Sequence, residues 1–348
     1  MKKKLYNRSA LLVLALLSAG MILNAQDAFK EVTGNYNVKE GATLNCDIRY
    51  SDMEILSWDK NVVDVVAEIT VDASSKSKAE ERLERINVSI NQSGSTVSIE
   101  TELDEGWSRN VKVDIRIIVK APTHMNLDME TAYGDLYVQE LNGLLNLEMK
   151  YGNLKAGKLG RGNEKPFSTM ELGYSDASIE QAGWLEAELA YSDLEISTSK
   201  MLFVESKYSK LSGESSGGIV AEGAYDKYFF DEVGNFVGEL KYSGIKFGAL
   251  TRKLNVEAKY THVKISHLSS DFKEVYADLS YGNLYLDVED GASFKLEAET
   301  HYGNLSTEVD GKLSKSKENN RVKMWGTVGS SPKGSITAVT RYGNIDIR

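Results

Sequence analysis

The chain of 348 residues contains little proline, cysteine or histidine. It has three prolines, one cysteine and four histidines. Proline cannot donate a hydrogen bond to a β ladder, so its scarcity permits long unbroken ladders. The single cysteine, Cys46, excludes an internal disulfide. Cys46 alternates with Leu44 and Ile48, which predicts a buried strand position; a reactive thiol or an intermolecular bridge is the alternative.

Catalytic motifs are also absent from the sequence. There is no HExxH, no glycine-rich phosphate loop, no cysteine pair and no nucleophile elbow. The enzyme class that suits a long parallel coil is polysaccharide cleavage, which needs a special pair of carboxylates in a groove. No such pair stands out among the acidic residues. We therefore predict a protein that is not an enzyme and needs no cofactor, with a polysaccharide-active enzyme as the disfavoured alternative.

Acidic residues outnumber basic ones by 51 to 41, which gives a net charge of −10. An acidic surface repels nucleic acid and anionic lipid. This balance predicts no nucleic-acid partner and favours basic partners or divalent cations. Loss of the first 25 residues would remove four positive charges and leave −14.

Residues 1–25 have the pattern of a secretory signal peptide. An apolar run from Ala10 to Leu17 is followed by small residues, with a cleavage position after Ala25. The run is shorter than the roughly 20 residues that a spanning helix needs, so we favour a signal peptide over a membrane anchor. The mature chain is then exported and spans no membrane. The positive start consists of Lys2, Lys3, Lys4 and Arg8.

A tyrosine followed by a tight polar pair recurs along the chain, as in Tyr191-Ser192-Asp193-Leu194. The spacing is 17 residues from Tyr174 to Tyr242, and then 18, 21 and 21. A fixed period near 20 residues is typical of stacked-repeat architectures. The twelve copies start at Tyr50, Tyr133, Tyr151, Tyr174, Tyr191, Tyr208, Tyr225, Tyr242, Tyr260, Tyr281, Tyr302 and Tyr342.

Apolar residues alternate before and after each tyrosine, and their parity changes at the polar pair. Leu185, Ala187 and Leu189 precede Tyr191, whereas Leu194 and Ile196 follow it. The alternation indicates strands, and the change of parity indicates a corner. We therefore predict an all-β parallel β-solenoid with rungs of about 17–21 residues. Twelve rungs about 4.8 Å apart give a rod on the order of 55 Å long. An antiparallel sandwich or barrel does not explain the constant period.

The tyrosines share the parity of the buried positions before them. We expect each ring to be partly buried at a corner and stacked on the rings above and below, which is a structural role. A carbohydrate-binding aromatic strip is the alternative. The structural ladder is expected to consist of Tyr174, Tyr191, Tyr208, Tyr225, Tyr242, Tyr260, Tyr281 and Tyr302.

An acidic residue stands three positions before eleven of the twelve tyrosines, with outward parity. If the rungs stack in register, these carboxylates align in one file. Adjacent carboxylates would then repel each other by roughly 0.9 kcal/mol even at the dielectric constant of water. Diagonal pairing with bases next to the tyrosines is one expectation. Binding of Ca²⁺ or of a cationic partner is the other. The candidate residues for this site are Glu171, Glu188, Glu205, Glu222, Glu239 and Glu257.

Two regions depart from the repeat. Residues 26–122 read as an N-terminal β region in which residues 75–86 form a short helix that caps the first rung, before solenoid repeats at 123–348. Residues 311–334 read as an irregular insertion. Trp325 is a candidate binding contact if this stretch projects as a loop. Alternatively, Val322, Met324 and Val328 form an ordinary strand that packs on the end.

Several elements resemble a bacterial family of secreted "putative adhesins", a domain-of-unknown-function family related to the head-GIN "putative autotransporter adhesins". They are the signal peptide, the segment from Tyr50 to Asp59, and the segment from Val111 to Pro122 that leads into Met125 to Val138. The recurring turn followed by two apolar residues also matches. The resemblance covers most of residues 30–348. It implies a β-helical protein of Gram-negative cell envelopes and transfers no functional residue.

These observations predict a non-enzymatic, adhesin-like protein that binds through a long repetitive surface. Its partner would be a protein or glycan of the cell envelope or of a host surface. A periplasmic structural or signalling partner of an envelope protein is the alternative. We expect the chain in the periplasm, on the cell surface or secreted.

Overall fold

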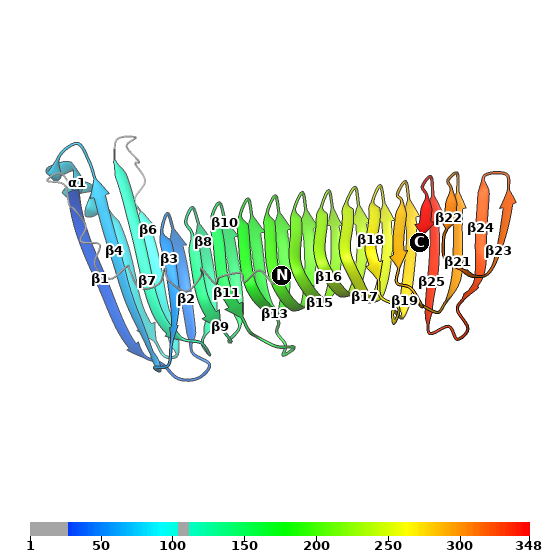
Figure 1. The fold of residues 1–348 in the computed structure, drawn as a ribbon. Coiled ribbons are helices and arrows are strands. Elements are labelled where there is room, and N and C mark those ends of the chain that lie inside the picture. Colours follow the sequence, from blue (N-terminus) through cyan, green and yellow to red (C-terminus); the bar gives the residue numbers. More distant parts are fainter. Residues whose placement is uncertain (1–26, 104–110) are drawn as a thin grey trace, which may run out of the picture.

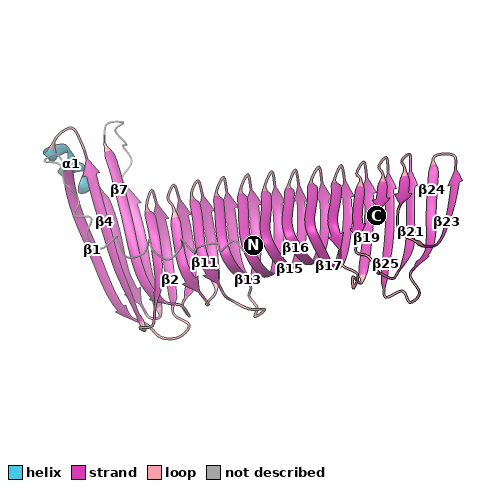
Figure 2. Ribbon diagram, viewed as in Figure 1, coloured by secondary structure: helices cyan, strands magenta, loops and turns pink. Residues whose placement is uncertain are grey.

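The computed structural model describes residues 27–103 and 111–348, and the expected signal peptide lies outside them. This part of the chain forms a long rod of stacked β-strands with one short helix near its N-terminal end (Figures 1 and 2). Most neighbouring strands are parallel and in register. The predicted all-β parallel β-solenoid is confirmed. The alternative, an antiparallel sandwich or barrel, is wrong.

Each central rung is one long strand that starts after one tyrosine and ends before the next. The first half of β13 pairs with β11 and its second half pairs with β12, so the strand bends and contributes to both sides of the rod. We call the side formed by residues just before each tyrosine the first flank, and the side formed by residues just after it the second flank. The long strands are β13 (Asp176–Ala190), β14 (Asp193–Lys207), β15 (Lys210–Ala224), β16 (Lys227–Lys241) and β17 (Gly244–Lys259).

Towards both ends each rung is divided into a separate strand for each flank. On the first flank these strands are β2 (Thr43–Arg49), β8 (Asn126–Ala132), β10 (Leu145–Lys150), β12 (Ser168–Gly173), β19 (Glu274–Ser280), β21 (Phe294–His301) and β25 (Gly334–Arg341). On the second flank they are β3 (Asp52–Trp58), β9 (Leu136–Leu141), β11 (Asn153–Leu159), β18 (His262–Leu268), β20 (Leu284–Val288), β22 (Leu305–Thr307) and β26 (Ile345–Ile347).

The order of rungs in space differs from their order in the sequence at the C-terminal end. Strand β25 pairs with both β19 and β21, and β26 pairs with both β20 and β22. The rung of Tyr342 therefore lies between the rungs of Tyr281 and Tyr302. A constant spacing of tyrosines cannot reveal such an insertion, because the inserted strands satisfy the same ladders.

Antiparallel strands close the N-terminal end of the rod. On the second flank β1 (Asp27–Asn37), β4 (Val62–Asp72) and β7 (Lys112–Pro122) continue the sheet beyond β3, and on the first flank β5 (Ile86–Ser93) and β6 (Thr96–Leu103) continue it beyond β2. Helix α1 (Lys76–Leu83) packs against β1 and β4 and buries Ala79. The helix is shorter than the predicted 75–86, because Ile86 already begins β5.

A β-hairpin closes the C-terminal end. Strands β23 (Gly311–Glu318) and β24 (Arg321–Val328) pair antiparallel, and β24 also pairs antiparallel with β21. Val322, Met324 and Val328 are buried. Most of the stretch expected to be irregular, residues 311–334, is thus ordered in a cap whose outer strand carries three lysines, a composition that protects a sheet edge from pairing with another chain.

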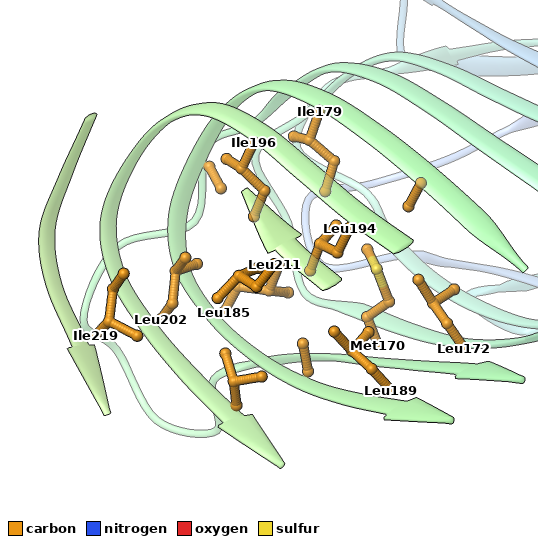
Figure 3. Close-up of a cluster of buried hydrophobic side chains, with 14 of the residues drawn as sticks. Met170, Leu172, Ile179, Leu185, Leu189, Leu194, Ile196, Leu202, Leu211 and Ile219 are labelled. Carbon is orange, nitrogen blue, oxygen red and sulfur yellow. The ribbon is translucent and has the colours of Figure 1, made fainter. Parts of the chain in front are cut away.

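The core lies between the two flanks and runs the length of the rod. Along each strand buried apolar residues alternate with exposed ones, as the pleat requires. Figure 3 shows Leu185 and Leu189 from the first flank facing Ile179, Leu194 and Ile196 from the second. Neither flank could bury its apolar face alone. The stacking of the rungs and the packing of one flank against the other therefore depend on each other.

Candidate functional site

All twelve repeat tyrosines adopt a left-handed backbone conformation, with φ between 52° and 65°. This conformation is uncommon for a residue with a bulky side chain and costs roughly 1–2 kcal/mol. It turns the chain from the first flank to the second and directs the tyrosine ring away from the core. The rings are 42–58% exposed. Parity alone places these rings on the buried side, but the positive φ interrupts the alternation.

The tyrosine rings form one continuous stack along the corner of the rod. Neighbouring centroids are 4.6–5.4 Å apart and the ring planes differ by 1–11°. Each inner ring therefore has both faces covered by other tyrosines. Sugar rings dock on the open faces of aromatic side chains, so this geometry favours the structural role over the carbohydrate-binding strip.

A column of hydroxyl groups occupies the position after the tyrosine on the central rungs, from Tyr174 to Tyr260. The backbone N–H of Ser192 donates to Ser209 Oγ at 3.2 Å, and Ser209 Oγ donates to the carbonyl of Lys207 at 2.9 Å. The pattern repeats along neighbouring central rungs and satisfies backbone groups of their tight corners. The column was not predicted from the sequence, although serine follows several of the tyrosines. Its members are Ser175, Ser192, Ser209, Ser243 and Thr261.

Asp226 replaces serine in this column and is 2% exposed. Its Oδ1 accepts the N–H of Ser209 at 2.8 Å, and its Oδ2 accepts the hydroxyl of Ser206 at 3.0 Å. Ser206 in turn shares a 2.7 Å hydrogen bond with the buried Tyr228. Burial raises the pKa of the Asp226 carboxyl above its usual value, although these hydrogen bonds oppose the shift.

The acidic residues three positions before the tyrosines align in one file on the first flank. Their Cα atoms are register partners from strand to strand. Val339 interrupts the file between Asp278 and Glu299, and Glu100 of β6 extends it at the other end. We call this row the acidic file. Its acidic members, in spatial order, are Glu100, Asp47, Glu130, Glu148, Glu171, Glu188, Glu205, Glu222, Glu239, Glu257, Asp278 and Glu299.

Ion pairs engage four members of the acidic file, whereas within the described residues Glu100, Asp47 and the six central glutamates form none. Near the ends Arg49 lies 3.7 Å from Glu130, Lys150 pairs with Glu148, and Arg341 lies 2.7 Å from Asp278. The terminal Glu299 is held by Arg321 and His301 at 2.6 Å each. In the described part of the chain, no ion pair is formed by Glu171, Glu188, Glu205, Glu222, Glu239 or Glu257. The six candidate glutamates are thus the longest unpaired run of the file among the described residues.

A long groove of about 690 Å³ runs beside this unpaired run, between the file and the tyrosine corner. Small residues such as Gly173, Ala190 and Ala224 leave it open. Burial raises the pKa of Glu188 above its usual value, and the neighbouring carboxylates of Glu171 and Glu205 raise it further. We call this feature the acidic groove. Its electrostatics favour a cationic occupant.

A metal site of the usual kind is not preformed in this groove. Among residues 27–103 and 111–348, no three histidine, cysteine, aspartate or glutamate side chains converge to hold a metal ion. The register spreads the carboxylates along a line, whereas Ca²⁺ takes six to eight oxygen ligands around one point.

Trp325 and Cys46 both lie within β-strands. Trp325 lies in β24 rather than in a projecting loop, and it is 42% exposed on the first flank opposite Glu297 and Ser314. It lines a separate groove of about 660 Å³ over the hairpin.

Cys46 is buried in β2, and burial raises the pKa of its thiol. A buried neutral thiol is poorly reactive.

No family model matches the chain, and no curated protein matches it. Solved structures match the chain only at low identity and low TM-score. A "putative adhesin" from Bacteroides fragilis has 10% identity and a TM-score of 0.30, covering 92% of this chain and 97% of that chain. A "putative adhesin" from Parabacteroides distasonis has 8% identity, the same coverage and a TM-score of 0.30. A "putative lipid binding protein" from Parabacteroides distasonis has 14% identity and a TM-score of 0.24, covering 93% of this chain and 98% of that chain.

Within the described part of the chain, no helix has the length and apolar character needed to cross a lipid bilayer.

Proposed function

We propose that the chain is a non-enzymatic, exported, adhesin-like binding protein whose acidic groove takes a cationic segment of a partner. The partner would be a protein of the cell envelope or of a host surface. The observation that carries the proposal is the run of six in-register glutamates, Glu171 to Glu257, that have no ion-pair partner although lysines stand two positions away on several rungs.

The unpaired run destabilises the free rod. Carboxylates on adjacent rungs repel by roughly 0.9 kcal/mol per neighbour even at the dielectric constant of water, and more strongly beside protein. Substitution of alternate glutamates by neutral residues would remove this repulsion without disturbing the core. A row of lysine or arginine side chains from a partner would offset the repulsion along the whole groove, and the contact would be sensitive to salt.

Titration calorimetry with a deca-lysine peptide tests the proposal. Wild-type protein should bind the peptide in low salt and lose affinity in 0.5 M NaCl. A variant with all six groove glutamates changed to glutamine should bind at least tenfold more weakly. The control neutralises six exposed glutamates elsewhere, so both variants have the same net charge. These control positions are Glu31, Glu40, Glu84, Glu180, Glu214 and Glu232.

Equal loss of affinity in the two variants would show that only net charge matters, and the groove proposal would fail. Turnover of any glycan in a polysaccharide panel would contradict the non-enzymatic assignment.

Location separates adhesion from the periplasmic alternative. We propose that residues 1–25 are removed as a signal peptide, leaving the cap region 26–122 and the repeats 123–348. Amino-terminal sequencing of the exported chain tests the cleavage. Digestion of the chain by protease added to intact cells would support adhesion at the surface, whereas full protection would favour a periplasmic partner.

A further inference from the structure

The charge on the second flank changes sign after β14. At the outward positions two and four residues after the tyrosine, β14 carries Asp193 and Glu195, although Lys155 already stands earlier in the second of these columns. On the next four rungs each column carries two consecutive lysines, and Ser212, Phe229, Gly244 and His262 fill the other positions. Four lysines therefore gather on a chain whose net charge is −10, opposite the flank that holds the acidic groove. They are Lys210, Lys227, Lys246 and Lys264.

These four lysines are neighbours in space. Lys210 and Lys227 are register partners on adjacent rungs, and so are Lys246 and Lys264. Adjacent strands lie about 4.8 Å apart, so the ammonium groups repel one another. Within the described residues none of the four forms an ion pair, not even Lys210 with its register partner Asp193.

Aromatic side chains stand on either side of the lysine pair in the column four residues after the tyrosine. Phe229 is half-buried next to Lys246 on the adjacent rung, and no other ring stacks on it among the described residues. Tyr285 follows Lys264 in register, and the Lys264 ammonium lies 5.2 Å from its ring centroid. Gly244 leaves the column beside Lys246 open. We call these four lysines with Phe229 and Tyr285 the lysine patch.

We propose that the lysine patch binds an anionic polysaccharide, with carboxylate or sulfate groups of the sugar chain on the lysines and a sugar ring against Phe229. Repeated ammonium groups suit a polymer with repeated negative charge, and a half-buried aromatic ring suits the apolar face of a sugar. The acidic file of a second copy would satisfy the lysines but would leave Phe229 without a role. Copies of this acidic chain also repel one another.

Fluorescence anisotropy with labelled decagalacturonate and labelled dextran sulfate tests the inference, and neutral dextran is the negative probe. Wild-type protein should bind at least one anionic probe with a salt-dependent affinity and should not bind neutral dextran. The variant Lys210→Ala/Lys227→Ala/Lys246→Ala/Lys264→Ala should bind at least tenfold more weakly. Which anionic probe binds more tightly distinguishes carboxylated from sulfated chains.

Matched controls separate the patch from general charge. Changing Lys200, Lys207, Lys241 and Lys259 to alanine removes the same charge away from the patch and should leave affinity within twofold. Phe229→Ala should weaken the polysaccharide but not deca-glutamate. The glutamine variant of the acidic groove should bind the anionic probes at least as well as wild type, so failure here is distinct from failure of the proposed function.

Three results would overturn the inference. They are the absence of binding to either anionic probe, full affinity in the patch variant, and equal binding of neutral dextran. Deca-glutamate binding that matches decagalacturonate, with no effect of Phe229→Ala on either, would instead identify an acidic peptide surface as the occupant. Far-ultraviolet circular dichroism of every variant checks that the rod is intact.

Discussion

At the scale of the residue, the repeat tyrosine combines two opposed effects. Its left-handed backbone would suit glycine or asparagine better, because a side chain at positive φ is strained. Its ring, however, stacks on two neighbours, and each contact contributes about 0.5–1.5 kcal/mol beyond burial. The stack outweighs the strain only when the rungs are in register, so the tyrosine reinforces the register of the whole ladder.

Substitutions at Tyr208 separate these two effects. Its ring stacks on Tyr191 at 5.0 Å and on Tyr225 at 4.6 Å. Tyr208→Ala loses both contacts and keeps the strain, so we expect a loss of about 2 kcal/mol in the free energy of unfolding. Tyr208→Gly relieves the strain and should be less destabilised than alanine by about 1 kcal/mol. Urea unfolding measures both, and a glycine variant no more stable than alanine would contradict the strain.

The buried Asp226 makes stability depend on pH. Its pKa is raised in the folded state by burial, so the folded chain holds a proton more tightly than the unfolded chain. The stability that protonation contributes is full below the unfolded pKa, about 3.9, and is lost as pH rises through the folded pKa. Asp226→Ser restores the hydroxyl column and should be more stable than wild type at pH 7, where the buried carboxyl is ionised.

The advantage of Asp226→Ser should shrink as the pH approaches 4, because wild type then holds its proton. Unfolding in urea at the two pH values measures the change. Asp231→Ser, an exposed position on the same rung, is the control and should show no such trend. An advantage that is constant with pH would contradict an ionisation effect at Asp226.

At the scale of the element, the period of the tyrosines predicted the rungs well. The alternation of apolar residues from Leu185 to Ile196, and its interruption at the polar pair, predicted two flanks and a corner. Both features are local properties of the strand sequence. The position of the Tyr342 rung could not be predicted, since non-local pairing decides which ladder β25 joins. The cap hairpin was also ambiguous, because Val322, Met324 and Val328 alternate weakly among lysines.

The hairpin should act as an edge cover. Val322→Asp/Met324→Asp places two charges where β24 packs on the end of the core, so the hairpin should detach and expose the edge of β21. We expect concentration-dependent association in multi-angle light scattering. Ser314→Asp/Thr327→Asp, at outward positions of the same hairpin, should remain as monodisperse as wild type. Association in both variants would argue against a covering role.

At the scale of the whole molecule, the rod carries the acidic file on its first flank and the lysine patch on its second. The acidic file could be predicted because a fixed offset from the tyrosine, repeated in register, becomes a row in space. The unpaired members of the file could not be predicted, because ion pairing depends on how far side chains reach from neighbouring rungs, as for Arg341 and Asp278. The lysine patch was missed because Lys210 and Lys246 occupy two different columns.

The central claim is that the groove glutamates repel one another until a cationic partner binds. The melting temperature with and without deca-lysine tests it in one measurement, because a ligand that binds only the folded state raises the melting temperature. Wild type and the control variant should melt higher with the peptide. The groove variant with six glutamines should melt higher than wild type without peptide and should gain nothing from it. A groove variant that melts no higher than wild type, and still gains as much from the peptide, would contradict the account.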